Sequence, residues 1–240
     1  TRYKYDGPDD TLFFKEIVDY TCDAWKKKDS SIWEKRGKKK HFVYSKLMCW
    51  VCIDRGIKIV EQNKQHIPER WERARQEIRQ HILEEGFSLK RNSFIQASDS
   101  EIIDASGLLI SLNGFLPPDD PKIAGTIEAA METLLTKEWL VYRHEHDSKQ
   151  SPFLLCSFWL IEALALSGKV RKAEGLFEKV ISHVSPLGLL AEEIDRKAGK
   201  LRGNFPQAYS HTGLINAFLY LSFAKGNTFR GPDLLGWLHQ

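Results

Sequence analysis

Two kinds of helical segment alternate along this 240-residue chain, and the alternation constrains its fold more than any other feature. Some segments are amphipathic with one polar face, whereas others are apolar almost all round, which is typical of helices surrounded by other helices. The alternating pattern of strands between turn residues is missing from the sequence. The amphipathic segments are 11–27, 69–86, 121–137 and 170–184, and the apolar segments are 43–60, 102–113, 153–167 and 207–224. The sequence therefore predicts an all-α fold.

The spacing of the apolar segments indicates a repeated outer-then-inner helical hairpin. Their starts are roughly 51 to 59 residues apart, which is longer than tetratricopeptide, ankyrin or HEAT units. We expect four hairpins of an α/α toroid, about eight helices, in a single domain over residues 1–240. The links from outer to inner helices are long and, in alternating hairpins, lie at one end, where binding and catalysis usually occur. These links are 28–42, 87–101, 138–152 and 185–206.

Composition narrows the class of protein. The net charge is +3, with a local +6 over residues 26–40 that we interpret as a polar surface rather than a nucleic-acid site, because few aromatic residues interleave the cations. No apolar run reaches the roughly 18 to 20 residues of a membrane span, and the N-terminus lacks a signal-like apolar core. The four cysteines are few for this length, so we expect them to be reduced and buried. These features favour a cytoplasmic protein.

Two acids in the long loops are candidates for catalysis. Glu34 directly follows Trp33 in the first loop, and Glu192 begins a Glu-Glu pair in the fourth. Hydrolysis of a glycoside by inversion needs two carboxyl groups, one acid and one base, with room for a water molecule between them. Taken singly, each acid is more typical of a solvated loop than of a catalytic site.

The third loop contributes polar groups without a metal motif. Arg143 has a guanidinium that can donate several hydrogen bonds in a fixed geometry, as sugar hydroxyls require. His144 and His146 have no third ligand at a recognisable spacing, and Cys49-x-x-Cys52 lies inside an apolar helix. We therefore expect no metal and no cofactor.

Several motifs, in the same order along the chain, resemble the glucoamylase family of glycoside hydrolases, family 15, in its bacterial and archaeal branch. The resemblance covers residues 11 to about 225 and implies an (α/α)6 barrel, in agreement with the alternation. The motifs are Ile32-Trp-Glu-Lys-Arg-Gly37, His41-Phe-Val-Tyr-Ser-Lys46, Asp104-Ala-Ser-Gly107, Tyr142-Arg143, Phe153-Leu-Leu-Cys-Ser-Phe-Trp159, Leu190-Ala-Glu-Glu-Ile-Asp195 and Gly203-Asn-Phe-Pro-Gln-Ala-Tyr-Ser-His211.

The resemblance also implies roles for five residues. Glu34 would be the general acid and Glu192 the general base of a single displacement that releases β-glucose from an α-glucoside. Trp33, Arg143 and Tyr209 would bind the substrate, which is an α-glucan oligosaccharide or trehalose. The leading hypothesis is an inverting, exo-acting α-glucosidase of the glucoamylase type. An α,α-trehalase of the same family is the alternative, and a non-catalytic carbohydrate-binding or regulatory toroid is the second alternative.

The chain departs from the family pattern in two places. Lys35 follows the acid where fungal members have a second acidic residue, and the first four helices of the barrel, with the Arg-Asp pair that grips the terminal glucose, are missing. Four hairpins make about two-thirds of a six-hairpin ring and leave apolar inner faces at its open ends. We expect a missing N-terminal segment or self-association to cover them, with weak activity of the chain alone.

Overall fold

A computed structural model describes residues 11–147 and 151–227, and these contain eight α-helices. The predicted all-α class is confirmed, and most helix positions agree with the sequence pattern. The helices are α1 (Thr11–Ala24), α2 (Val43–Gln62), α3 (Glu69–Glu85), α4 (Leu109–Leu112), α5 (Pro121–Thr133), α6 (Leu154–Leu166), α7 (Val170–Ile181) and α8 (Ala208–Ala224). Among the described residues, no helix is long and apolar enough to cross a membrane.

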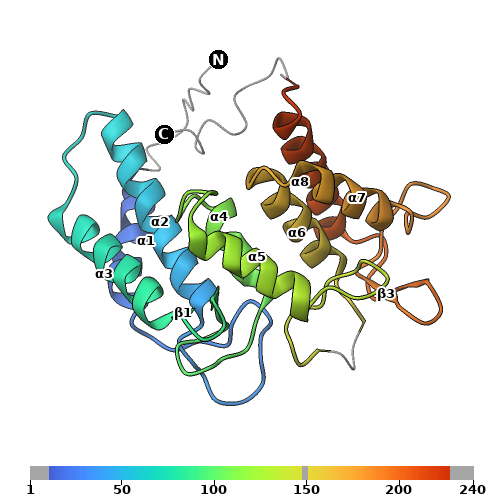
Figure 1. Ribbon diagram of the computed structural model, residues 1–240. Helices are drawn as coiled ribbons and strands as arrows, with labels where there is room; N and C mark the ends of the chain where they lie inside the picture. The colour runs from blue at the N-terminus through green and yellow to red at the C-terminus, as the bar shows by residue number, and fades with distance from the viewer. Residues whose placement is uncertain (1–10, 148–150, 228–240) are drawn as a thin grey trace. The chain divides into compact units, whose positions relative to one another are not determined.

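The chain divides into two compact units, each of which we describe by itself. The described N-terminal unit comprises residues 11–87 and 96–100, and the C-terminal unit comprises residues 88–95, 101–147 and 151–227. In the N-terminal unit α1, α2 and α3 pack against one another (Figure 1). Trp71, Ala74 and Ile78 of α3 form its buried stripe, as the periodicity predicts, while Arg73 and Glu77 are exposed.

The centre of the C-terminal unit is α6, which contacts α4, α5, α7 and α8 (Figure 1). Its sequence is apolar nearly all round, and its side chains are buried from Cys156 to Ala165. Surrounding such a helix on all sides removes most of its apolar surface from water, at about 25 cal/mol per Å². The inner position predicted for this segment is confirmed.

Helix α8, predicted as an inner helix, is buried on one side only. Ala217, Tyr220 and Leu221 are buried, whereas Ile215 and Phe218 are 59% and 51% exposed. In the N-terminal unit, Phe13 and Tyr20 of α1 are each 65% exposed. What covers these apolar side chains stays a prediction.

The inner segment predicted over 102–113 is shorter than expected. It consists of a 3₁₀ helix, η1 (Ala105–Leu108), followed by α4. The reason is non-local, because the backbone of residues 103–105 pairs with the third loop. The amide of Ala105 donates to the carbonyl of Arg143 at 2.8 Å, and that of Glu145 donates to Ile103 at 3.0 Å. This pairing holds Asp104 in an extended conformation, with φ −133° and ψ 136°, so the helical turns begin only at Ala105.

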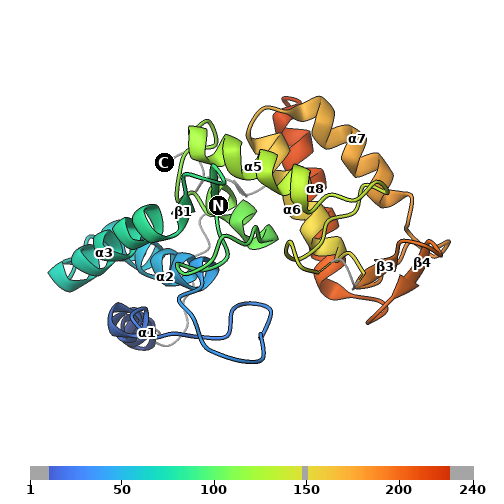
Figure 2. The ribbon, with the colours of Figure 1, turned by 60° about the horizontal axis from the view of Figure 1, so that its bottom comes forward.

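The long loops contain short antiparallel strands that the sequence pattern does not reveal. β1 (Phe87–Ser88) pairs with β2 (Ser93–Phe94), and β3 (Glu193–Asp195) pairs with β4 (Lys200–Arg202). Figure 2 shows the β3–β4 hairpin at one end of α6 and α8. Phe153, just before α6, forms a bridge with Glu193, so the hairpin is joined to the start of that helix.

The first residues of three inner segments share one interaction. The amide of Val43 in α2 donates to the carbonyl of Gln96 at 3.0 Å, and that of Leu154 in α6 donates to Glu192 at 3.0 Å. Ala105 of η1 makes the corresponding bond to Arg143. Amides in the first turn of a helix have no partner within the helix, so each of these takes its partner from the next long loop. The loops are thereby fixed to the helix starts.

The cysteines agree with the prediction in part. All four are free thiols, and Cys22 and Cys156 are buried. Cys49 and Cys52 are half-buried. Burial raises the pKa of the Cys22 thiol to about 11, which keeps it protonated at neutral pH.

We predict that Glu162 of α6 makes the stability of the protein depend on pH. Its side chain is 4% exposed, and its Oε1 has no hydrogen-bond partner among the described residues. Burial raises its pKa to about 8. Between about pH 4.3, where an unfolded glutamate titrates, and pH 8, the folded state therefore holds the extra proton. The free energy of unfolding should then fall as pH rises, by up to about 1.4 kcal/mol per pH unit.

Urea unfolding at pH 5, 6, 7 and 8 tests this with Glu162→Gln, whose neutral amide removes the titration. The variant should lose less stability than the wild type between pH 5 and pH 8, whereas Glu178→Gln on the exposed side of α7 should follow the wild type. Three half-buried histidines, His41, His81 and His183, have a lowered pKa and so make the free energy of unfolding rise with pH. They are present in the wild type and in both variants, so the difference between wild type and Glu162→Gln reports on Glu162 alone. Identical slopes for Glu162→Gln and wild type would contradict the prediction.

Candidate active site

The loop between α1 and α2 presents Trp33 and Glu34 on a closed ring of backbone. Asp29 and Lys40 close the ring, since each amide donates to the other's carbonyl, at 3.0 and 3.2 Å. Within the ring, the amide of Glu34 donates to the carbonyl of Ser31 at 3.1 Å and forms a tight turn. Glu34 has a φ of +46°, a conformation that non-glycine residues rarely adopt and that is enriched at functional sites.

The base of this loop is held by buried polar groups. Lys46 of α2 is 2% exposed, and its ammonium donates to the carbonyls of Trp25 and Lys27, the latter at 2.7 Å. Asp29 accepts hydrogen bonds at 2.7 Å from the amide of Ser31 and from the hydroxyl of Ser45. Burial lowers the pKa of Lys46. These contacts fix where the loop leaves α1 and where it enters α2.

Two cations of the basic run connect the first loop to residues 96–100 of the second. Lys35 donates to the side-chain oxygen of Gln96 at 2.9 Å, and Lys40 pairs with Asp99 at 2.9 Å. The hydrogen bond from Lys40 lowers the pKa of Asp99. Part of the basic run thus has a structural role within the N-terminal unit. In the loop Trp33 is half-buried, and Glu34 is exposed.

In the C-terminal unit, Glu192 is held by Asn204 on the neighbouring stretch of the fourth loop. Its Oε2 accepts hydrogen bonds from the amide of Asn204 at 3.0 Å and from the side-chain Nδ2 at 2.9 Å. The amide of Glu192 in turn donates to the carbonyl of Asn204 at 3.0 Å. The side chain is half-buried, and among the described residues its Oε1 has no hydrogen-bond donor. One oxygen is therefore fixed and the other is open to a further proton donor.

Gly203 is required where it lies against Glu192. It has a φ of +73°, and a Cβ at this position would be 2.8 Å from Oε2 and 2.9 Å from Cβ of Glu192. Real side chains do not tolerate such a distance without movement, so any larger residue would displace Glu192 or the hairpin.

Arg143 lies between two carboxylates. Its guanidinium donates to Oε1 of Glu193 and to Oδ2 of Asp147, the latter at 3.4 Å, and stacks on the ring of Phe153 at 4.8 Å. Asp147 is buried. Burial alone would lower the pKa of Arg143, but the hydrogen bond and the charge of Glu193 outweigh it and raise the pKa. The guanidinium is thus charged and held in one orientation.

Tyr209 lies in the first turn of α8 and is 64% exposed. That turn is held against the segment that precedes Glu192, since the hydroxyl of Ser210 donates to the carbonyl of Ala191 at 2.7 Å. The amide of Leu190 is 3.3 Å from Nε2 of His211, which acts as acceptor. Tyr209 and Glu192 therefore belong to one end of the C-terminal unit.

The structure brings Arg143 into contact with Glu193, the residue after Glu192, with Tyr209 on the adjacent helix turn. Trp33 and Glu34 share the loop of the N-terminal unit. The pairing of Glu34 with Glu192, and the role of every predicted site residue, stay predictions. No group of three His, Cys, Asp or Glu side chains suited to a metal occurs within residues 11–147 and 151–227.

Sequence reasoning missed three residues that hold the site. In the sequence Glu193 resembles any acid of a polar loop, although an acid next to a proposed base is a candidate partner for a nearby arginine. Asp147 lies four residues after Arg143, a spacing that brings charged side chains together on a helix. Here the two residues form an ion pair in a loop, where the spacing alone does not predict one. Asn204 directly follows a glycine at the start of the last motif. Each contact joins segments whose proximity depends on the fold.

The comparisons with known proteins agree with one another. Residues 7–219 match the family model described as glycosyl hydrolases family 15. A trehalase of Mycobacterium tuberculosis is 42% identical over 219 residues, which are 88% of this chain and 32% of that protein. A trehalase of Thermoplasma volcanium is 39% identical over 208 residues, 85% of this chain and 33% of that protein. The chain therefore spans about a third of the length of these curated relatives.

Solved structures resemble the fold. A family 15 glucoamylase from Hypocrea jecorina matches with a TM-score of 0.70 at 12% identity, covering 86% of this chain and 46% of that one. A glucoamylase from Saccharomycopsis fibuligera matches with a TM-score of 0.71 at 11% identity, covering 89% and 61%. At this identity the likeness shows the fold alone, and it confirms the predicted α/α architecture as part of an (α/α)6 barrel.

We predict that Gly203→Ala destabilises the protein more than Gly199→Ala. Both glycines have a positive φ, at +73° and +62°, which costs an alanine about 1–2 kcal/mol. A Cβ at Gly199 meets nothing within 4 Å, whereas at Gly203 it overlaps Glu192 and adds about 1–3 kcal/mol. Urea unfolding of the two variants measures the difference, and equal losses of stability would contradict the contact with Glu192.

Proposed function

Because the chain belongs to glycosyl hydrolases family 15, we propose that it carries both catalytic carboxylates of an inverting hydrolase of α,α-trehalose. The observation that carries the proposal is the carboxylate of Glu192, which Asn204 holds in place, in a chain of this family whose next residue, Glu193, holds the charged guanidinium of Arg143. An α-glucan is the other substrate that the sequence suggests.

Glu192 has the geometry of a general base. Both hydrogen bonds from Asn204 end on Oε2, and they orient the carboxylate without occupying Oε1. In an inverting hydrolase the base accepts a proton from the attacking water, which needs one open oxygen in a fixed position. We assign this role to Oε1 of Glu192.

Glu34 is proposed as the general acid. Its carboxyl group is exposed on a loop whose backbone is fixed at both ends, and Trp33 beside it offers an aromatic surface for a sugar ring. The acid would give its proton to the glycosidic oxygen as the bond to C1 breaks. In the same displacement, water that gives its proton to Glu192 would attack C1 from the opposite face and invert its configuration.

Arg143 is proposed to bind a sugar hydroxyl. A guanidinium has five N–H donors in a fixed planar geometry, and the bonds of Nη1 to Asp147 and of Nη2 to Glu193 set the orientation of this one. Because these carboxylates already hold it in place, binding a sugar would cost little further side-chain entropy. Tyr209, exposed on the first turn of α8, would contact the substrate with its ring.

The relatives favour trehalose over an α-glucan. The trehalases of M. tuberculosis and T. volcanium are 42% and 39% identical to this chain, whereas the glucoamylases of H. jecorina and S. fibuligera are 12% and 11% identical. The α,α-trehalase, which the sequence offers as the alternative, therefore has better support than the α-glucosidase of the glucoamylase type.

Proton NMR of the first products tests the reaction and the substrate together. Inversion at the attacked carbon gives β-glucose, while the leaving glucose keeps its α-configuration, so trehalose should give the two anomers in equal amounts before they equilibrate. The measurement uses the intact protein that contains these 240 residues, with maltose and soluble starch as comparison substrates. Release of α-glucose alone, or faster hydrolysis of maltose or starch than of trehalose, would contradict the proposal.

The two carboxylates should respond differently to a substrate with a good leaving group. Fluoride leaves C1 of α-glucosyl fluoride without help from an acid, so Glu34→Gln should lose about 10²–10⁴-fold in kcat on trehalose but far less on the fluoride. Glu192→Gln should lose activity on both, because each needs an activated water. Glu84→Gln, on the exposed side of α3, is the control. Equal losses for Glu34→Gln on the two substrates would remove Glu34 from the role of acid.

A further inference from the structure

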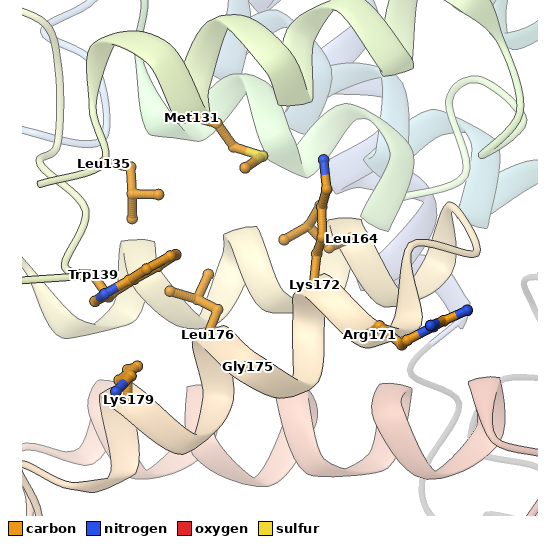
Figure 3. A pocket seen from close by; sticks show the side chains of 9 residues that line it. All are labelled: Met131, Leu135, Trp139, Leu164, Arg171, Lys172, Gly175, Leu176 and Lys179. Atoms are coloured by element: carbon orange, nitrogen blue, oxygen red, sulfur yellow. The ribbon is translucent and has the colours of Figure 1, made fainter. Parts of the chain in front are cut away.

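An apolar groove lies between α5 and α7 over α6, within the C-terminal unit (Figure 3). It encloses about 370 Å³, and its walls are formed by Met131, Leu135, Trp139, Leu164 and Leu176. This volume lies in the range of small-molecule sites in proteins. None of the proposed catalytic or substrate-binding residues lines it.

Trp139 stands at the edge of the groove with an unusual backbone. Its φ is +65°, and its side chain is 46% exposed. A tight turn holds it there, since the amide of Trp139 donates to the carbonyl of Thr136 at 3.1 Å and that of Thr136 donates to Leu140 at 2.8 Å. A bulky residue in this conformation is an outlier that persists where the surrounding structure imposes it. The turn keeps a large aromatic surface out of the core and beside the groove.

Charges are segregated around α7. Lys172 and Lys179 line the groove, whereas Glu174 and Glu178 line a separate depression that also includes residues of α8. Figure 3 shows Lys172 extending toward α5 and Lys179 beneath Trp139, while the guanidinium of Arg171 points away from the apolar side chains. Within the part of the chain that the structure describes, neither lysine has an ion-pair partner, and no acid lines the groove.

Gly175 leaves the backbone of α7 open to the groove. It is exposed, and a Cβ added there would meet nothing within 4 Å. Glycine destabilises the interior of a helix relative to alanine, and packing does not require it here. Its presence permits a flat group to lie directly on the helix backbone between Trp139 and Leu176.

We propose that this groove binds an aromatic monoanion, with its ring between Trp139 and Leu176 and its anionic group at Lys172 or Lys179. Apolar walls with an unpaired cation at each end complement a ring with one anionic group. A neutral sugar suits the groove poorly, because no carboxylate, amide or hydroxyl side chain lines it to accept and orient sugar hydroxyls. The site is separate from the proposed hydrolysis.

The test compares three probes that share one ring system: naphthalene-1-sulfonate, 1-naphthylmethanol and 1-naphthylmethylammonium. Each is titrated into the ¹⁵N-labelled chain while NMR follows the amide of Gly175 and the indole N–H of Trp139. The sulfonate should shift both resonances and bind about three- to tenfold more tightly than the alcohol, because exposed ion pairs contribute modestly. The ammonium should bind most weakly, and added salt should reduce the preference for the anion.

Four variants separate the groove from other apolar surfaces. Gly175→Trp should fill the groove and abolish the shift of Trp139, whereas Gly175→Ala should retain binding. The double variant Lys172→Gln/Lys179→Gln should bind the sulfonate and the alcohol equally, and Lys90→Gln, on an exposed residue outside the groove, should behave as wild type. Thermal melts confirm that each variant is folded.

Several results would overturn the proposal. Equal affinity for the three probes would remove the role of the lysines. Shifts confined to α1 or α8, whose exposed apolar side chains also attract naphthalene rings, would move the site elsewhere. Shifts of Gly175 and Trp139 with trehalose or maltose at comparable concentrations would make it a sugar site.

Discussion

Backbone amides at the starts of the inner helices organise this protein. In three of these segments the first amide, which has no partner inside its own helix, donates to a carbonyl in the following long loop. A buried amide without a partner costs free energy comparable to a lost hydrogen bond, so each helix start determines where its loop lies. Two of the three accepting carbonyls belong to Arg143 and Glu192. The helical scaffold therefore positions the backbone of two candidate site residues directly.

The side chains of the site are oriented by a second set of contacts on this fixed backbone. Asn204 holds one oxygen of Glu192, and Gly203 permits the close approach by having no Cβ. Asp147 and Glu193 accept hydrogen bonds from the two terminal nitrogens of Arg143 and so fix its guanidinium. Binding of a sugar would then cost little reorganisation, which is the advantage of a site built before the substrate arrives. The loop of Glu34 is fixed by its backbone, because main-chain hydrogen bonds between Asp29 and Lys40 close it.

The sequence predicted the helices well because their apolar periodicity is a local signal. Trp71 and Ile78 lie on the buried face of α3 as expected, and α6 is buried all round. Prediction failed where distant segments decide the local structure. Residues 102–104 are not helical because the third loop pairs with them, and the strands of the fourth loop exist because Phe153 and Arg202 lie beside Glu193. The same holds for the partners of Arg143 and Glu192, which no spacing in the sequence reveals.

The central claim is that Glu34 and Glu192 act as one acid–base pair. It is tested most directly by the distance between their carboxyl groups in a crystal structure of the intact protein with an unreactive trehalose analogue bound. An inverting mechanism predicts a separation of about 6.5–9.5 Å, with a water molecule beside Oε1 of Glu192. A separation of about 5–5.5 Å would indicate a retaining mechanism, and carboxyl groups that do not face the same sugar ring would contradict the assignment altogether.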